Sequence, residues 1–465
     1  MEINLPKGKT LSVFSLVMIN IIAVDSLRTL PISAEYGFSL IFFYLLAGII
    51  FFIPVALVAA ELATGWPETG GLYVWVKEAF GKPVGFMVIW MQWIYNIVWY
   101  PTILAFIASA FAYLISPKMA LDKQYLFVSI LVLFWLTTIA NLYGMRVSSI
   151  ISAFGALIGT LLPMVIIISL AVYWYCTGMP LSMELSWQAI LPKDVSINSL
   201  VLFTGILFGL VGMEMSAVHA GDVESPQRDY PKALLFSTII IFVTLVLGSL
   251  AVAMVIPQEQ LNLVTGFIDA FTIFFTSLHL KWMVPVVVAM VIIGGISSVS
   301  AWVLGPSKGL MVSAKDGCLP AFFFKVNRYG APSTILIIQA ILFSFLSSVF
   351  IFSESINASY WMLSALTEQL AMAVYVLMFL AVIRLRITKP EVERAFKIPG
   401  GLLGISLVAL LGLASCIIAI VLGFFPPSHI AIKHTGNYRL FILCGIVIFV
   451  IMPALFVNWF QKKQL

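Results

Sequence analysis

Long apolar stretches separated by short polar segments run along the chain from Leu11 almost to its last residue. Each has about 20 residues or more, the length at which a helix rising 1.5 Å per residue crosses a hydrocarbon core of roughly 30 Å. Because lipid offers the backbone no hydrogen bonds, these stretches are expected to be helices. The pattern predicts an all-α membrane protein with twelve transmembrane helices, at residues 11–34, 38–62, 83–115, 124–142, 147–175, 197–220, 232–256, 282–313, 332–353, 357–386, 401–424 and 438–461.

The composition agrees with this pattern. Of the 465 residues, 62% are apolar and 10% are charged, against roughly a quarter charged in an ordinary soluble domain. The polar segments are mostly short, the longest lying near 177–196, 256–281 and 387–400. The protein is therefore expected to act within the lipid bilayer rather than through a soluble domain.

The distribution of basic residues predicts the orientation. With both termini in the cytoplasm, 18 of the 25 Lys and Arg residues fall in cytoplasmic segments, six fall outside, and Arg28 lies within a helix. Lys and Arg accumulate on the cytoplasmic side of membrane proteins. We therefore predict a multi-pass inner-membrane protein with cytoplasmic N- and C-termini. The net charge of +5 then reflects topology, and no nucleic-acid partner is expected.

The sequence contains no pattern that predicts a metal, a cofactor or catalysis. Its four cysteines and four histidines lack metal-ligand spacing. Residues 305–309 (GPSKG) lack the spacing of a phosphate-binding loop, and no G-x-S-x-G or H-E-x-x-H sequence occurs. We predict neither an enzyme nor an ATP-driven pump.

Two apolar stretches are interrupted near their middle. The first carries Asp25, Ser26 and Arg28, and a charge at mid-depth costs about 2.5 to 3.5 kcal/mol, so it normally faces a cavity or a partner. The sixth contains residues 204–212 (TGILFGLVG) followed by Glu214. Alone, these glycines also fit simple close packing of helices.

The two interruptions lie five helices apart, and this spacing predicts an internal repeat. A unit with an odd number of spans inverts its topology, and paired interruptions in two inverted halves indicate a transporter's midplane site. The predicted repeats are residues 11–175 and 197–386, followed by two additional helices at 401–461.

The charges of the first helix have two interpretations. Asp25 and Arg28 are three residues apart, close enough on a continuous helix to form a structural ion pair. Alternatively, the helix unwinds here and frees backbone groups for the carboxylate and ammonium of a zwitterion, with either side chain adding its charge. Both interpretations place the two residues beside the transport pathway.

Other polar residues are candidates for coupling and gating. A buried charge at Glu214 is costly, which favours proton exchange, although backbone amides can also fix such a carboxylate. Glu368 is a second such acid, or else lies in a wet helix mouth. Tyr375 follows two turns later, so both side chains can face one cavity, although plain packing also explains a tyrosine. Ser298 offers a hydroxyl for substrate or sodium, yet serines in membrane helices often bond their own backbone.

Four motifs resemble the amino acid-polyamine-organocation superfamily: residues 67–75 (PETGGLYVW), 224–233 (ESPQRDYPKA), 305–309 (GPSKG) and 396–401 (FKIPGG). The nearest group is the bacterial glutamate/GABA antiporters. This resemblance implies a LeuT-like five-plus-five core with broken helices 1 and 6, alternating access, and roles for Glu214 and Tyr375. The sequence departs from that group at Ser298, where the group has a glutamate. It also departs at Ser26 to Arg28, where the group has an aromatic and acidic stretch. The expected substrate-binding residues are Ala23, Val24, Asp25, Ser26, Arg28, Phe208, Gly209, Gly212 and Ser298.

Together these observations predict a secondary active transporter of amino acids, an antiporter or permease of glutamate/GABA-type or related substrates. Proton dependence is the expected coupling, and a sodium-coupled symporter is the alternative. A transport-dead amino-acid sensor is a further alternative, which the short polar segments disfavour. The sequence leaves open which amino acid or amine is carried and the oligomeric state.

Overall fold

A computed structural model describes residues 11–116, 118–143, 153–192, 195–353, 355–427 and 435–462. The regular elements within these ranges are helical, apart from one isolated bridge between Leu11 and Val223. The α-helices are α1 (Val13–Val24), α2 (Leu30–Ala34), α3 (Leu40–Ala47), α4 (Ile53–Gly65), α5 (Leu72–Phe80), α6 (Lys82–Ile115), α7 (Lys123–Asn141), α9 (Leu162–Cys176), α10 (Ile197–Gly209), α11 (Pro226–Val255), α12 (Gly266–Ser277), α13 (Met283–Lys315), α14 (Ser333–Leu346), α15 (Val349–Phe352), α16 (Ile356–Thr388), α17 (Gly401–Leu422) and α18 (Thr435–Lys462).

Eleven helical segments in this part of the chain are long and apolar enough to cross a membrane. They confirm the predicted helical, multi-span architecture. The expected sixth span is not among these eleven segments, because it is interrupted after the 13-residue helix α10. Residues 144–152, where the fifth span was expected to begin, lie outside the described ranges, as do residues 1–10 and 463–465 of the termini expected in the cytoplasm.

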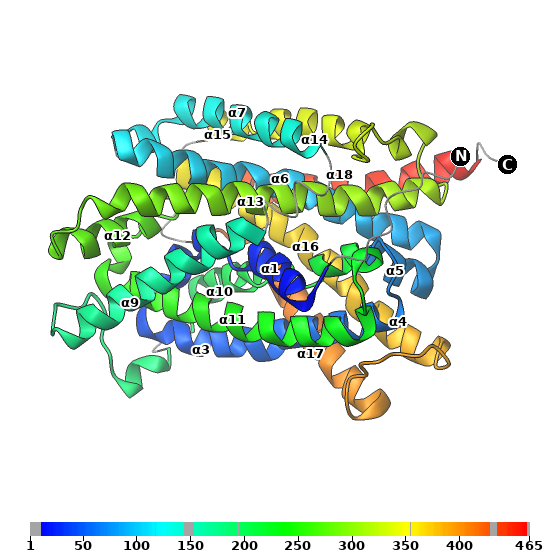
Figure 1. Cartoon of the computed structure of the whole chain (residues 1–465), viewed down its shortest axis with the longest axis horizontal. Coiled ribbons are helices and arrows are strands. Elements are labelled where there is room, and N and C mark those ends of the chain that lie inside the picture. The colour runs from blue at the N-terminus through cyan, green and yellow to red at the C-terminus, as the bar shows by residue number, and fades with distance from the viewer. Residues whose placement is uncertain are drawn as a thin grey trace.

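The long helices run side by side along the longest dimension of the molecule (Figure 1). Helices α6 and α13 pack against each other, with α7 and α14 beside them, while α11, α9 and α3 lie on the other side. The interrupted helices α1 and α10 lie between these two groups. Asn20 of α1, and Asp25 and Arg28 that follow it, are buried within the protein.

Glycine allows the closest helix contact. Gly159 lies in a π-helical stretch (Gly155–Leu161) that precedes α9, and it faces Gly294 of α13. A Cβ atom placed on Gly159 would lie 2.1 Å from the backbone nitrogen of Gly294. Small residues permit such backbone contact between membrane helices, so this pair fixes the position of the fifth predicted span against the eighth.

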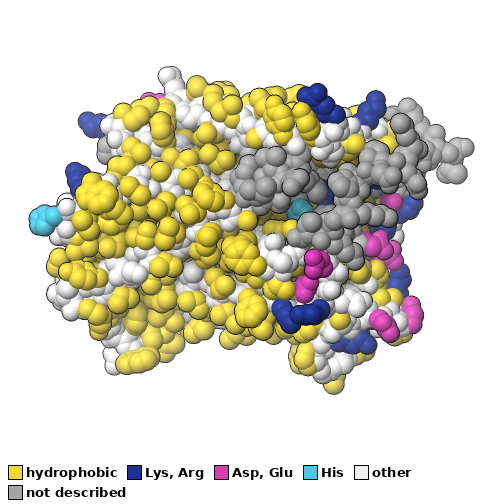
Figure 2. Space-filling view, in the orientation of Figure 1, with side chains coloured by type: hydrophobic (Ala, Val, Ile, Leu, Met, Phe, Trp, Pro, Cys, Tyr) yellow, Lys and Arg dark blue, Asp and Glu magenta, His cyan; other side chains and the backbone are white. Residues whose placement is uncertain are grey.

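The outer surface is mostly hydrophobic. Figure 2 shows apolar side chains over most of one face, with most of the visible charged side chains toward its right-hand end. Large apolar residues stand out from the outer helices, including Phe345 at 78% exposed and Leu403 at 80%. A patch of this extent is rare on a soluble monomer, and it matches a surface solvated by lipid.

The first span breaks at Asp25 and Ser26. Helix α1 ends at Val24, Ser26 is extended, and a 3-10 turn (Leu27–Thr29) leads into α2. Pro31 occupies the second position of α2 and has no N–H with which to continue a helix across the break. The backbone therefore changes direction at the charged residues.

The second break follows α10 and depends on one glycine. Gly212 has a φ of +126°, a conformation that residues with a Cβ rarely adopt. A Cβ here would also lie 3.0 Å from Trp302 and 3.2 Å from Val24. The chain then continues as a 3-10 helix (Met215–Asp222).

A buried ionic cluster joins α4 to the end of α16 and the segment that follows. The Glu61 carboxylate accepts hydrogen bonds from the Arg386 guanidinium, with Nε at 2.8 Å, and from the backbone N–H of Ile398 at 2.9 Å. Arg394 Nε lies 3.6 Å from the same carboxylate, and Glu61 is 1% exposed. One acid therefore holds residues 386–398 against α4.

Candidate functional site

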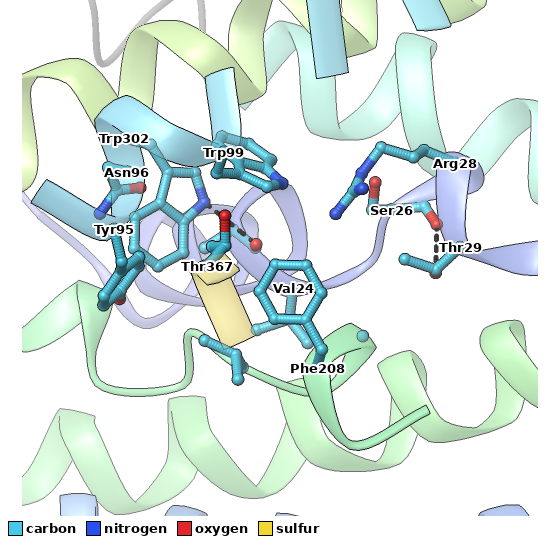
Figure 3. A pocket seen from close by; sticks show the side chains of 13 residues that line it. Val24, Ser26, Arg28, Thr29, Tyr95, Asn96, Trp99, Phe208, Trp302 and Thr367 are labelled. Atoms are coloured by element: carbon cyan, nitrogen blue, oxygen red, sulfur yellow. Dashed lines mark hydrogen bonds between the residues drawn. The ribbon is translucent and has the colours of Figure 1, made fainter. Parts of the chain in front are cut away.

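A small cavity lies between the two helix breaks (Figure 3). It is lined by Ala23, Val24, Ser26, Arg28, Thr29, Tyr95, Asn96, Trp99, Phe208, Gly209, Val211, Trp302 and Thr367. Its free volume is about 30 Å³, which is room for about two water molecules. An amino acid is larger than this, so side chains that line the cavity must move before one can fit.

Aromatic rings form much of the cavity wall. Trp302 of α13 packs at a tilt against Trp99 of α6, with ring centroids 6.0 Å apart, and the Tyr95 ring lies 6.2 Å from that of Trp302. The Trp302 indole donates a hydrogen bond to the Ala23 carbonyl at 3.1 Å. This bond fastens the end of α1 to α13 at the edge of the cavity.

Two helix ends converge on this space. Ala23 and Val24 are the last residues of α1, and Phe208 and Gly209 are the last of α10, and all four line the cavity. The final carbonyls of a helix lack intrahelical partners and carry a partial negative charge. Both ends therefore provide a favourable environment for a positively charged group such as an ammonium.

Arg28 supplies the positive charge of the site. Its Nη1 donates to the Tyr360 hydroxyl at 2.9 Å and to Thr102 Oγ1 at 3.4 Å. The guanidinium Cζ lies 5.6 Å from the ring centroid of Trp99 and 5.5 Å from that of Phe208. The side chain points into the cavity from the 3-10 turn after the break (Figure 3).

Asp25 does not pair with Arg28 in this structure. Its Oδ2 accepts a hydrogen bond from Thr244 of α11 at 2.8 Å, and its Oδ1 is buried without a partner. A spacing of three residues brings two side chains together on a continuous helix, and the break after Val24 separates them. The ion-pair interpretation is therefore not what the structure contains.

Glu214 lies beside the break after α10 rather than in the cavity lining. It is 1% exposed, and it accepts hydrogen bonds from Tyr375 of α16 at 2.5 Å and from Gln92 of α6 at 3.3 Å. The Tyr375 hydroxyl also accepts the backbone N–H of Gly212 at 2.9 Å. One hydroxyl thus links the acid, the break and α16.

Tyr375→Phe is expected to weaken this linkage. The change removes two hydrogen bonds and leaves the buried Gly212 N–H without a partner, which costs about 1–3 kcal/mol. We expect a lower thermal unfolding midpoint in detergent together with slower transport. Tyr143→Phe, at an exposed tyrosine, is the matched control. Equal midpoints and rates for Tyr375→Phe and the wild type would contradict this role.

The other predicted residues lie outside the cavity lining. Glu368 is buried beside Thr204 of α10, and its Oε1 has no hydrogen-bond partner. Tyr375 and Glu368 both face the sixth predicted span, although neither lines the cavity. Ser298 is buried in α13, where its neighbour Ser297 donates to the Ile293 carbonyl.

The sequence-based set and the cavity therefore overlap in part. Six of the nine predicted substrate residues line it: Ala23, Val24, Ser26, Arg28, Phe208 and Gly209. The lining that sequence reasoning missed comes largely from α6, α13 and α16. Gln92 and Asn96 stand one helical turn apart in the mostly apolar α6, and this pair of polar residues was the available signal for that wall.

Comparisons with known proteins show which family the sequence matches. A family model described as amino acid permease matches residues 9–461. An uncharacterized transporter of Legionella pneumophila is 55% identical over 96% of both chains. A glutamate/gamma-aminobutyrate antiporter of Lactococcus lactis is 31% identical over 98% of this chain and 92% of its own. A probable agmatine/putrescine antiporter of the same organism is 22% identical over 96% and 94%.

The chain belongs to the amino acid permease family. The resemblance inferred from its motifs is thereby confirmed, and the permease is a multi-pass membrane protein that transports amino acids. The family does not assign its binding residues. The candidate binding residues are those that line the cavity between α1 and α10.

Proposed function

We propose that this permease carries amino acids across the bacterial inner membrane by alternating access around the cavity between α1 and α10. The observation that carries the proposal is the meeting of two broken helices at one small, partly polar cavity. Discontinuous helices at the midplane are the common way in which transporters present backbone groups to substrate. The antiport named for its relatives supports exchange as the mode of transport.

The proposed architecture has twelve spans in a five-plus-five inverted repeat. The eleven long segments and the shorter α10 with its 3-10 continuation together account for twelve. Residues 11–175 and 197–386 form the two repeats, and each begins with a broken span. Residues 401–461, which include α17, follow the repeats.

Reconstitution into liposomes tests the proposal. Purified permease in vesicles preloaded with one amino acid is expected to take up a labelled amino acid from outside. A panel of amino acids identifies the substrate, and vesicles without protein are the control. Folded permease that neither takes up nor exchanges any of them would refute the proposal.

Glu214 is the proposed coupling acid, with Glu368 as a second. Neither forms an ion pair with Lys or Arg in the part of the chain that the structure describes, so a proton is the available means of neutralising each buried carboxyl. The two hydrogen bonds to Glu214 come from groups attached to α6 and α16. Relative movement of these helices changes its surroundings and therefore its affinity for a proton.

Glu214→Gln is expected to flatten the pH dependence of transport. The amide keeps the size of the side chain and cannot exchange a proton. Initial uptake rates measured from pH 5 to pH 8 are expected to change with pH in the wild type and to stay level in the variant. An unchanged pH profile would assign coupling to another group, and loss of transport when choline replaces sodium would favour sodium symport.

A further inference from the structure

The guanidinium of Arg28 is a buried charge whose hydrogen bonds go to hydroxyl groups. The residue is 4% exposed, and its Nε is buried without any partner. In the described ranges no Asp or Glu forms an ion pair with it, and the cavity lining contains neither residue type. Arg28 therefore has no carboxylate in ion-pair contact among the described residues.

Its aromatic surroundings do not neutralise this charge. The faces of Trp99, Phe208 and Tyr360 lie within 5.5–5.6 Å of the guanidinium carbon. Cation–π contacts offset part of the lost hydration, but a charge inside a membrane protein is normally paired with another. A guanidinium presents a planar fork of N–H donors that matches a carboxylate. The missing partner is an anion of that shape.

The rest of the cavity has the opposite polarity. The carboxyl ends of α1 and α10 each carry about half a negative charge, so together they match one ammonium group. Arg28 matches one carboxylate. A ligand with both groups satisfies both features, whereas a diamine leaves Arg28 unpaired and brings a second positive charge beside it.

We infer that Arg28 binds a substrate carboxylate and makes a carboxylate obligatory, so that this permease accepts amino acids and rejects polyamines. The inference rests on the proposed location of the substrate in this cavity. It also separates the permease from its relative named as an agmatine/putrescine antiporter. The carboxylate is either the α-carboxylate or one at the far end of the substrate.

Equilibrium binding tests the inference without requiring transport. The carboxylate probes are L-glutamate, L-glutamine and the other protein amino acids, together with γ-aminobutyrate. Putrescine is the amine without a carboxylate. Binding to purified permease is followed by the fluorescence of the cavity tryptophans and by thermal shift. The wild type is expected to bind at least one carboxylate probe and to bind putrescine at least tenfold more weakly.

Methyl esters of the best-binding probe isolate the contribution of each carboxylate. For L-glutamate, the α-ester and the γ-ester distinguish the two sources. Esterification of the bound carboxylate is expected to weaken binding about 10- to 100-fold in the wild type. In Arg28→Gln the free acid is expected to bind as weakly as the ester does, so the difference between them disappears.

Arg28→Lys and Arg228→Gln complete the set. Lysine keeps the charge without the planar fork, so an intermediate preference for the free acid is expected. Arg228 is exposed at the start of α11, and its change is expected to leave binding unaltered. A structural role for Arg28 would weaken acid and ester equally, preserving their ratio.

The outcomes are distinct. An acid-to-ester ratio that persists in Arg28→Gln, or putrescine binding as tight as that of an amino acid, overturns the role of Arg28 and leaves the proposed function standing. Binding of no amino acid by well-folded wild-type protein refutes the proposed site and this inference together. An acid-to-ester ratio that is lost in Arg28→Gln and kept in Arg228→Gln supports the assignment.

Discussion

Gly159→Ala is expected to abolish the folded, active state of the permease. The added methyl group would lie 2.1 Å from the Gly294 nitrogen and 2.2 Å from its Cα. Backbone atoms cannot rotate aside as a side chain can, so the helices must separate along their contact. Overpacking a core costs about 1–3 kcal/mol when side chains can adjust, and more is expected here.

Detergent extraction followed by size-exclusion chromatography and thermal unfolding measures this effect. Gly436→Ala in α18 is the matched control, because a Cβ there has no atom within 4 Å. Alanine favours a helix over glycine by about 1 kcal/mol, so the control is expected to be neutral or more stable. A monodisperse, fully active Gly159→Ala protein would show that the two helices do not approach this closely.

Glu61→Gln is expected to destabilise the permease by about 3–5 kcal/mol, the range for removing one partner of a buried ion pair. The change leaves Arg386 and Arg394 near each other without a shared counter-charge. It also weakens the bond that fixes the Ile398 backbone. We therefore expect a large fall in the thermal unfolding midpoint.

A second salt bridge in the same region provides the control. Glu78 pairs with Lys389, and their side chains are 30% and 33% exposed. Surface pairs contribute about 0–1 kcal/mol, so Glu78→Gln is expected to shift the midpoint little. Similar midpoints for Glu61→Gln and Glu78→Gln would mean that the Glu61 cluster contributes no more than a surface pair.

Sequence reasoning predicted the spans and the breaks because both have local causes. A run of about 20 apolar residues is visible in the chain itself, as are charges such as Arg28 within one. Helices α5 and α12 were not predicted, because with 9 and 12 residues they are shorter than a membrane span. The number of twelve transmembrane helices and the inverted repeat stay predictions.

The composition of the site was less accessible to sequence reasoning, since it depends on contacts between distant segments. Trp99 and Trp302 resemble ordinary apolar residues of a membrane helix, and only their convergence makes them a cavity wall. The partners of Asp25 and Glu61 likewise come from helices more than 200 residues away. No local pattern identifies such partners.

The unpaired charge of Arg28 also affects whether the permease favours exchange or one-way transport. An empty carrier that changes its facing direction must carry the buried Arg28 guanidinium without an anionic partner. A loaded carrier makes the same passage with that charge neutralised by its cargo. If Arg28 binds the substrate carboxylate as proposed, the loaded carrier is expected to reorient faster than the empty one, and such a difference in rates favours exchange over one-way transport. On the proposed role, the arginine in the 3-10 turn of the first span both selects the substrate and favours reorientation with substrate bound.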